Sequence, residues 1–402
     1  MAVSEEPIRR PRGLRPRPRR RPARQGISTS SNPMGESEIL RVEDLHTSFF
    51  LPIGELQAVR GVSFSLQRGR SLGIVGESGS GKTVLARSIM RLNTGSNVKT
   101  SGSAFFNGRD LLALPRREMR RLWGTEIAMI FQDPMTSLNP MVKIGRQVTE
   151  HLRQHKNVNR RAARQIALDL LNEVRIPEAE SRINRLPHEL SGGMRQRVSI
   201  ASALACEPSL LFADEPTTAL DVTVQHQILN LLSREQRQRN MTMVMVTHDL
   251  GVIAGRTDDT LVMYAGKVVE QASTDEIFEK TQHPYTEALM RSIPRTTHAS
   301  HTPLAAITGR PPVATHLPAG CAFSLRCPYV QPKCHEEDPP LVSIGTSGHK
   351  SACWYPVGSD ANREAFERNL SDRLPQTLAV AESLDADQSP GIPAGLPDGG
   401  IA

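Results

Sequence analysis

Hydrophobic and polar positions along the chain change their period several times. Residues 39–66 contain short β-like runs, in which Val62, Phe64 and Leu66 alternate with polar residues, and the sequence LPIGEL interrupts them as a turn. The continuous apolar run SLGIV, at 71–75, predicts a buried strand, and KTVLARSIMRL, from residue 82, predicts a helix. The glycine-rich loop GESGSGKT, at 76–83, joins these two elements.

Helical spacing returns further along, and strands then alternate with helices. The apolar positions of RRAARQIALDLLNEV recur every three or four residues, namely Ala163, Ile166, Ala167, Leu170, Leu171 and Val174. After LSGG at 190–193 we predict the helix RQRVSIASALAC, the strand SLLFA, a helix carrying Val224, Ile228 and Leu231, the strand TMVMVT, and the hairpin TLVMYAGKVVEQ, turning at Ala265 and Gly266. This alternation predicts an α/β fold: a mostly parallel sheet covered by helices, with a helical segment inserted between the two glycine loops.

Charge is concentrated at one end of the chain. The 402 residues suit two or three structural units, and the formal net charge is +7. Residues 1–37 hold nine arginines, no lysine and three glutamates, so they carry +6 of this charge. The remainder is close to neutral, which argues against a broad nucleic-acid-binding face.

Both ends of the sequence predict disorder. Residues 1–37 are rich in arginine and proline, and 357–402 are rich in Pro, Gly and Asp. For the first tail two other interpretations stay open: a start at Met34, or contact with anionic lipid head groups or nucleic acid. No apolar run approaches the roughly 18–20 residues that span a bilayer.

The loop GESGSGKT has the composition of a phosphate-binding loop. Its glycines permit a tight turn whose backbone N–H groups point at one anion, and the following helix adds its positive dipole end. Lys82 would reach the β- and γ-phosphates and the Thr83 hydroxyl would ligate Mg²⁺. The strand before the loop and the helix after it favour this interpretation over a structural glycine turn.

Polar side chains follow three other apolar runs. Asp214 ends a strand, where a carboxylate suits a contact to Mg²⁺, and Glu215 can act as general base toward an attacking water. His248 follows TMVMVT and could bond the γ-phosphate, although a lone histidine at a strand end is more often structural. Gln132 follows IAMIF, where an amide can ligate Mg²⁺ or orient water.

Taken together, these motifs resemble those of ABC transporter ATPases. GESGSGKT, FQDP, LSGGMRQR, LLFADEPTTALD and VTHDLG have the order and spacing of the Walker A, Q-loop, signature, Walker B with D-loop, and H-switch motifs. The resemblance implies a RecA-like P-loop core, an antiparallel β subdomain and an inserted helical subdomain. It implies that the loop residues Gly76, Glu77, Ser78, Gly79, Ser80, Gly81, Lys82 and Thr83 bind ATP, with Thr83, Gln132 and Asp214 serving Mg²⁺, Glu215 as catalytic base and His248 as the switch histidine.

The same resemblance assigns the second glycine loop to a dimer. In this family the signature residues Ser191, Gly192 and Gly193 face the γ-phosphate held by the partner subunit, and Asp221, on the D-loop, contacts that subunit. An aromatic residue usually stacks on adenine, and Phe49 or Phe50 is near the corresponding place; either could equally belong to the core.

A finer resemblance is to the ATPase subunits of oligopeptide, dipeptide and nickel permeases. GIVGESGSGKT, MIFQDPMTSLNP, MYAGKVVE and HPYTEALMRSIP carry it. We expect an ATPase domain at 38–285, with a helical subdomain at about 133–192, and a permease-type extension at 286–356. The implied partners are two membrane-spanning permease subunits, a second, similar ATPase chain and a solute-binding protein, with no nucleic acid. The implied location is the cytoplasmic side of the cell membrane, as a peripheral subunit.

Four of the five cysteines lie in that extension: Cys321, Cys327, Cys334 and Cys353. A cytosolic setting disfavours disulfides, and zinc ribbons usually pair their ligands as C-x₂₋₄-C, which this spacing lacks. Four thiolates at looser spacing can hold a [4Fe–4S] cluster, as some members of the subfamily do. We therefore predict a cluster, with zinc or reduced packing cysteines as alternatives. Cys206, between signature and Walker B, is predicted to be a small buried hydrophobe.

The leading hypothesis is an ATP-hydrolysing subunit that energises uptake of di- and oligopeptides. One alternative keeps the importer and changes its cargo to nickel or another small solute. Another is a soluble ABC ATPase that acts on nucleic acid or ribosomes; the arginine tail favours it, but such proteins commonly carry two cassettes, whereas each motif occurs once here.

Overall fold

The computed structural model describes residues 37–133, 137–156, 158–218, 220–293, 307–346 and 348–369. The tail predicted at 1–37 lies outside the described residues except for Ser37, as does 370–402. Within the described part, no helix has the length and apolar character needed to cross a membrane.

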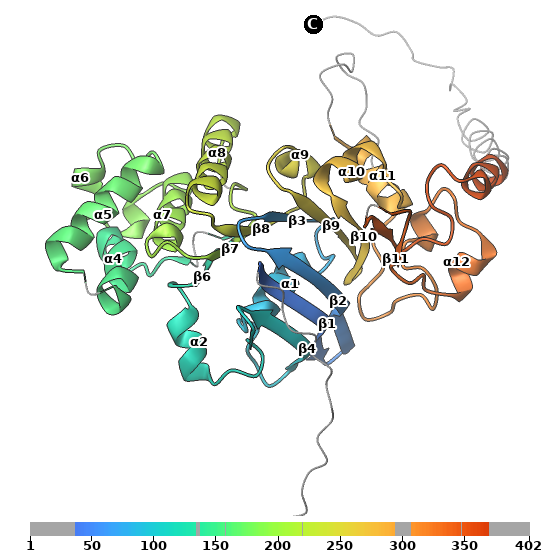
Figure 1. Ribbon diagram of the computed structural model, residues 1–402, viewed down its shortest axis with the longest axis horizontal. Coiled ribbons are helices and arrows are strands. Elements are labelled where there is room, and N and C mark those ends of the chain that lie inside the picture. Colours follow the sequence, from blue (N-terminus) through green and yellow to red (C-terminus); the bar gives the residue numbers. More distant parts are fainter. Residues whose placement is uncertain are drawn as a thin grey trace, which may run out of the picture. The chain divides into compact units, whose positions relative to one another are not determined.

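An antiparallel sheet and a helix begin the fold. The described strands β1 (Glu38–Leu51), β2 (Gly54–Gln67), β4 (Val98–Phe106) and β5 (Arg109–Asp110) form a four-stranded sheet in the order β2-β1-β4-β5. This sheet contacts α1 (Lys82–Ile89), and Figure 1 shows the two together. The inward positions Leu40, Val42, Val62 and Leu66 are buried with Leu85 and Ile89 of α1 in one apolar cluster. The alternation in the sequence therefore marks the face that packs on the helix.

The larger sheet holds the predicted parallel core. Its described strands run in the order β11-β12-β10-β9-β3-β8-β7-β6. Strands β3 (Ser71–Val75), β6 (Ile127–Ile130), β7 (Leu210–Asp214), β8 (Thr242–Thr247) and β9 (Asp259–Tyr264) pair in parallel, while β10 (Lys267–Ser273) pairs with β9 in the predicted hairpin. The first four are buried along their whole length, which explains why they are continuous apolar runs.

Helices gather at one end of this sheet, beside β6 (Figure 1). They are α2 (Arg116–Leu122), α4 (Ile144–His155), α5 (Arg160–Glu173), α6 (Ala179–Arg182), the short η1 (Pro187–Glu189) and α7 (Gly192–Leu204); the next helix, α8 (Val222–Gln238), follows β7. The predicted stripe on α5 is buried at Ala163, Ala167, Leu170 and Leu171. An amphipathic face, rather than local propensity, therefore determines how this helix packs.

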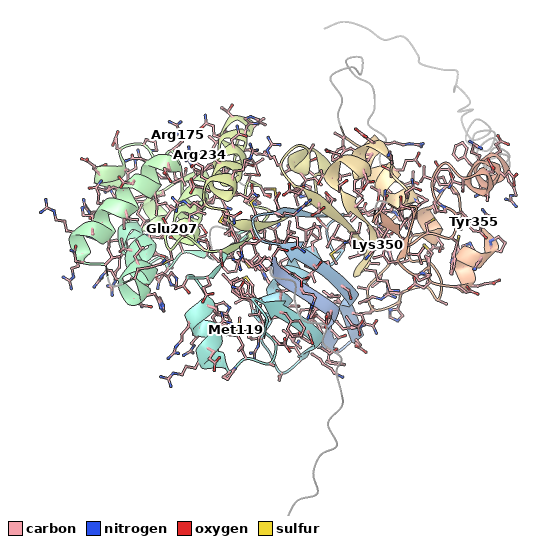
Figure 2. All side chains as sticks on the ribbon, viewed as in Figure 1. Met119, Arg175, Glu207, Arg234, Lys350 and Tyr355 are labelled. Atoms are coloured by element: carbon pink, nitrogen blue, oxygen red, sulfur yellow. The ribbon has the colours of Figure 1, made fainter. Side chains whose placement is uncertain are left out.

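The cysteine-containing extension joins the other end of the sheet. After α9 (Leu250–Ile253), α10 (Thr274–Glu279) and α11 (Pro284–Arg291) come η2 (Ser324–Arg326), α12 (Pro332–Glu336), β11 (Val342–Ser343) and β12 (Lys350–Ser351). Strand β12 pairs with β10, so the extension continues the core sheet. In Figure 2, Lys350 and Tyr355 of the extension lie at the opposite end of the described fold from Arg175 and Glu207.

A buried carboxylate ties the extension to the core. Glu270 of β10 is fully buried and accepts hydrogen bonds from the backbone N–H groups of Gln282 (2.6 Å) and His283 (3.1 Å). Its Oε1 also lies 2.8 Å from Nε2 of His349, next to β12. Because a buried carboxylate is stable only when such partners satisfy it, the core and the extension stabilise each other here.

The tail predicted from residue 357 begins too early. Residues 360–369 are helical, and Asn362 and Ala365 are buried on one face. Asn369 Nδ2 donates to the carbonyl oxygens of Pro328 and Val330, each at 3.0 Å. The polar composition of ANREAFERN gives no sequence signal for this helix, because only one narrow face of it is buried.

Gly102 offers a direct test of the small sheet. The register of β1 and β4 shifts between Glu43 and His46, and Gly102 faces this bulge with φ 97°. An added Cβ would lie 2.3 Å from the carbonyl oxygen of Asp44. Gly102→Ala should therefore lower the free energy of unfolding by about 1–3 kcal/mol, measured by urea denaturation.

The matched control is Gly108→Ala. Gly108 also has positive φ, 76°, but an added Cβ there would meet nothing within 4 Å. The Gly108→Ala variant should have only the backbone strain, and its free energy of unfolding should fall less than that of Gly102→Ala. Equal losses for the two variants would show that the close approach to Asp44 does not matter.

Candidate active site

The parallel core strands bring the predicted residues to one edge of the sheet. The phosphate-type loop follows β3, Gln132 follows β6, Asp214 ends β7, and His248 follows β8. Because the carboxyl ends of parallel strands meet at the same edge, residues far apart in sequence become neighbours.

The loop after β3 is a cradle with one buried cation. Gly81 has φ 99°, and a Cβ at this position would lie 2.2 Å from the carbonyl oxygen of Ala58, so only glycine fits. Lys82 is 4% exposed, and its Nζ donates to the carbonyl oxygens of Gly76 (2.7 Å) and Glu77 (2.9 Å). Burial lowers the pKa of Lys82. An ammonium at the first residue of α1 whose partners, two carbonyl oxygens and the Ser80 hydroxyl, are all neutral is suited to a phosphate.

Asp214 and Thr83 form a pair that suits Mg²⁺. Thr83 Oγ1 donates to Asp214 Oδ1 at 2.8 Å, while Asp214 Oδ2 is buried without a partner among the described residues. Burial raises the pKa of the Asp214 carboxyl. A hydroxyl, a carboxylate oxygen and an unsatisfied second oxygen are the hard donors that Mg²⁺ takes beside phosphates.

Glu215 is held by residues from three different segments. Its Oε2 accepts from Gln132 Nε2 and from Thr218 Oγ1, both at 3.0 Å, and its Oε1 lies 3.1 Å from Nδ1 of His248. Its backbone is left-handed, with φ 44°. Such a conformation is costly for a residue other than glycine and is found most often at functional sites. The Q-loop, Walker B and H-switch residues therefore meet at one carboxylate.

A cavity of about 690 Å³ lies over these groups. Of the predicted residues, Ser78, Gly79, Gly81, Lys82, Thr83, Gln132 and Glu215 line it. It is also lined by residues that the sequence did not point to: Leu56, Gln57 and Ala58 of β2, Ala265 and Gly266 of the β9–β10 turn, and Arg310, Pro311, Pro312 and Ala314 of the extension. Neither Phe49 nor Phe50 of β1 is among the lining residues, and Phe50 is 49% exposed.

Other predicted residues lie apart from this cavity. Ser191 is the N-cap of α7, and its hydroxyl accepts from Met194 N at 3.3 Å; Ser191 and Gly192 are exposed. Asp221 caps α8 in the same way and is also exposed. The structure of one chain thus leaves the signature and D-loop residues free to face a second molecule, and their predicted contacts remain predictions.

Glu77 makes contacts that the sequence did not predict. Its backbone N–H donates to Tyr285 Oη at 2.7 Å, and its carboxylate contacts Arg326. The backbone N–H and the carboxylate of Glu77 are thus engaged by residues of α11 and the extension. A glutamate inside a phosphate-loop motif gives no sequence signal for such a partner nearly 250 residues away.

The four cysteines of the extension share one cavity. Cys321, Cys327, Cys334 and Cys353 all line it, with His283 and Phe323 beside them, and the free space is about 20 Å³. Burial raises the pKa of the Cys321 thiol to about 11 and that of Cys353 to about 12, and it also raises the pKa of Cys327. Among the described residues, no group of three or more His, Cys, Asp or Glu has an arrangement that could hold a metal ion. Cys206 is buried, as predicted.

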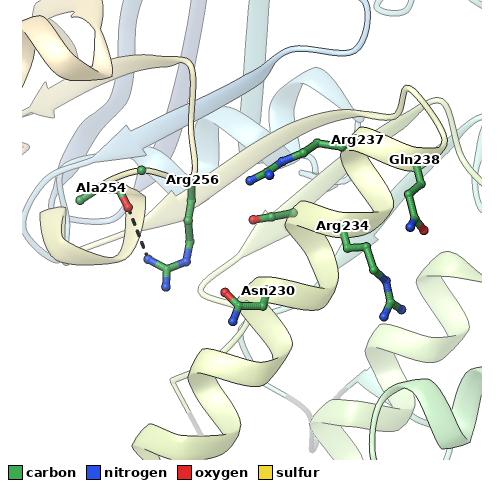
Figure 3. A pocket seen from close by; sticks show the side chains of 8 residues that line it. Asn230, Arg234, Arg237, Gln238, Ala254 and Arg256 are labelled. Atoms are coloured by element: carbon green, nitrogen blue, oxygen red, sulfur yellow. Dashed lines mark hydrogen bonds between the residues drawn. The ribbon is translucent and has the colours of Figure 1, made fainter.

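A separate hollow lies between α8 and the segment after α9 (Figure 3). It measures about 520 Å³ and is lined by Arg234, Arg237 and Arg256. Arg256 is engaged by the carbonyl oxygens of Val252 and Ala254 and by His226. None of the predicted site residues lies in it, so we assign the chemistry to the cavity at the sheet edge.

Comparison with known proteins decides the family. Residues 59–218 match the family described as ABC transporter, and 269–334 match the oligopeptide/dipeptide transporter C-terminal region. The oligopeptide transport ATP-binding protein OppD of Escherichia coli is 46% identical over 82% of this chain and 98% of its own length. The chain belongs to the ATP-binding subunits of ABC transporters.

Two further relatives of this ABC subunit support the finer resemblance. OppD of Bacillus subtilis is 48% identical over 79% of the chain and 89% of its own length. The dipeptide transport ATP-binding protein DppD of Escherichia coli is 45% identical over 81% of the chain and 98% of its own length.

Among solved structures, the dimeric ATP-binding cassette MJ0796 bound to ADP and Pi superposes with TM-score 0.54 at 26% identity, covering 59% of this chain and 99% of that one. The predicted P-loop ABC fold is thereby confirmed.

Thr83→Val tests the Mg²⁺ assignment. The substitution keeps the volume of the side chain and removes the hydroxyl that contacts Asp214. We expect Mg²⁺ to strengthen binding of a fluorescent ATP analogue to the wild type and to have little effect on the variant, a difference of at least about 10-fold in affinity. Thr125→Val, in an exposed turn, is the control; a full Mg²⁺ effect in Thr83→Val would contradict the assignment.

Proposed function

We propose that this ABC subunit hydrolyses ATP to energise the import of di- and oligopeptides. The observation that carries the proposal is the Glu215 carboxylate, held by Gln132, Thr218 and His248 beside the Lys82–Thr83 cradle. Peptide cargo is supported by the oligopeptide/dipeptide match of 269–334 and by relatives named for oligopeptide and dipeptide transport.

We assign a role in the reaction to each of the predicted catalytic and phosphate-binding side chains. The γ-phosphate displaces the carbonyl partners of Lys82, whose ammonium then neutralises phosphate charge. Glu215 accepts a proton from the water that attacks the γ-phosphorus, Gln132 orients that water, and ADP leaves with the bridging oxygen. Thr83 and Asp214 would hold Mg²⁺, which supplies charge neutralisation on the phosphate oxygens when bound. His248 contacts Glu215, and we assign it the role of a hydrogen-bond donor to the γ-phosphate.

The second glycine loop supplies the other half of the site in a dimer. Ser191 is the exposed N-cap of α7, so the first backbone N–H groups of this helix lie near the surface. The loop that contains Ser191 has no lysine. These groups suit the γ-phosphate of an ATP held by Lys82 of a second ATPase chain, because a helix N-terminus stabilises an anion that already has a cation. A similar but different chain is our preferred partner, with a second copy of this one as the alternative.

An apolar groove suits the membrane-spanning partners. It measures about 420 Å³ and lies between β6, α4 and α7, with Trp123, Phe131 and Val142 among its walls. Met141, beside Val142, is 83% exposed. Gln132 follows the strand that lines this groove, so a permease segment docked there would respond to the nucleotide. We propose that this chain is a peripheral subunit on the cytoplasmic face of the membrane, where it binds two permease subunits. A solute-binding protein would act on the opposite side of the membrane.

We also propose that the four cysteines hold a [4Fe–4S] cluster. Convergence of four thiols from separate segments on one cavity supports this, and their looser sequence spacing favours a cluster over zinc. Such thiols ligate as thiolates, so loading must displace their protons, and the cavity must widen.

Glu215→Gln should separate binding from hydrolysis. The amide keeps the shape of the side chain and cannot accept the proton, so we expect the hydrolysis rate to fall at least about 100-fold while the affinity for ATP is retained. Phosphate release by the transporter in membranes or nanodiscs measures the rate. Glu207→Gln, which affects an exposed carboxylate paired with Arg239, is the control, and unimpaired turnover in Glu215→Gln would refute the catalytic assignment.

Anaerobic purification tests the cluster. We expect a coloured protein with about four irons and four sulfides per chain, and a colourless Cys334→Ser variant. Cys206→Ser should keep the colour, because Cys206 is not among the residues that line the four-cysteine cavity. Stoichiometric zinc, or thiols that all react with Ellman's reagent in the native protein, would contradict the proposal.

A further inference from the structure

One buried ion pair joins the cysteine extension to the phosphate-binding loop. Arg326 ends η2, next to Cys327, and its guanidinium makes a two-pronged contact with Glu77: Nη1 to Oε2 at 2.6 Å and Nη2 to Oε1 at 2.9 Å. The Arg326 side chain is 3% exposed and that of Glu77 is 27% exposed. The parallel fork-to-carboxylate geometry fixes orientation as well as distance.

The guanidinium is satisfied on every side. Besides Glu77, it donates to the carbonyl oxygens of Thr308 (3.0 Å) and Ile307 (3.3 Å) and to Tyr264 Oη (3.3 Å). Its carbon lies 5.9 Å from the ring centres of Tyr264 and Phe323. These contacts use all five N–H donors of arginine. A lysine could not reproduce them, because an ammonium has three donors and no planar fork.

The loop is held from its backbone side by the same cluster. Glu77 N–H donates to Tyr285 Oη, and the Tyr285 ring packs 4.6 Å from that of Tyr264 and 5.4 Å from that of Phe323. Phe323 also lines the cysteine cavity, together with Cys321 and Cys327. A continuous set of packed side chains therefore connects the cysteines to Glu77 in the phosphate-binding loop.

The extension reaches the nucleotide cavity by a second route. Arg310, Pro311, Pro312 and Ala314 line that cavity, and the nearby carbonyl groups of Ile307 and Thr308 are the ones that Arg326 engages. Arg326 thus fixes the phosphate-binding loop and the lining segment of the extension at once.

We propose that Arg326 is a positioning residue for the nucleotide site, and that through it the nucleotide site and the four-cysteine cavity are coupled. The proposal rests on the proposed ATP-binding function. Burying an ion pair costs desolvation, so the pair alone is weak evidence of stability. Its effect is geometric: with Glu77 held, Lys82 and the loop amides keep the arrangement that a triphosphate requires. By linkage, nucleotide binding must in turn restrain η2 and Cys327.

The test is a double-mutant cycle on nucleotide affinity in the full-length chain. We expect Arg326→Gln and Glu77→Gln each to weaken binding of Mg²⁺ and a fluorescent ATP analogue about 10-fold, and the double variant to be no weaker than either single one. Arg326→Lys should recover only part of the loss. Arg291→Gln removes another Arg–Glu contact, between the 56% exposed Arg291 side chain and Glu287 of α11 at 2.7 Å, and should leave affinity unchanged.

A second measurement needs no variant at position 326. In the wild type, Mg²⁺ and ATP should slow hydrogen exchange of amides in residues 321–327, and Lys82→Ala should abolish this protection. Wild-type affinity in Arg326→Gln, additive losses in the cycle, a lowered melting temperature without an affinity change, or unprotected 321–327 amides would each overturn the proposal. Wild-type ATP binding by Lys82→Ala would instead refute the proposed function itself.

Discussion

The site depends on one geometric constraint: the buried strands β3, β6, β7 and β8 are parallel and end at the same edge. The four chain segments that leave these ends carry the cradle, the amide, the two carboxylates and the histidine. Glu215 therefore lies next to Gln132 and His248, which contact it at 3.0 and 3.1 Å. A change that tilts one strand would therefore move one reacting group relative to the others, without altering any of them chemically.

Much of this arrangement is legible in the sequence. Continuous apolar runs such as SLGIV and TMVMVT correspond to strands with the predicted bounds, because strands buried on both faces are apolar at most positions. Gly81 was predictable as a loop glycine, since a left-handed backbone against the Ala58 carbonyl excludes any side chain. Local sequence patterns indicate which positions are buried and which backbone conformation they adopt. These two properties determine the core of this site.

The remainder depends on contacts between distant segments. The partnership of Glu77 with Arg326 and the Arg310–Ala314 wall of the cavity arise from tertiary packing that leaves no periodic trace. The helix at 360–369 was missed because its buried face is short. The side chains of Glu77 and Arg326 are polar and would be unremarkable in solvent; only the position of the partner gives each of them a role.

The fold thus presents a phosphate cradle and its catalytic carboxylate together, with the signature serine exposed elsewhere on the same chain. Hydrolysis should therefore require two ATPase chains. Specific ATPase activity and molecular mass, followed together over a dilution series of the purified chain with and without a second ATPase subunit, test this most directly. Activity should track the two-chain species and disappear with it on dilution. Undiminished hydrolysis by a species with the mass of one chain would contradict the account.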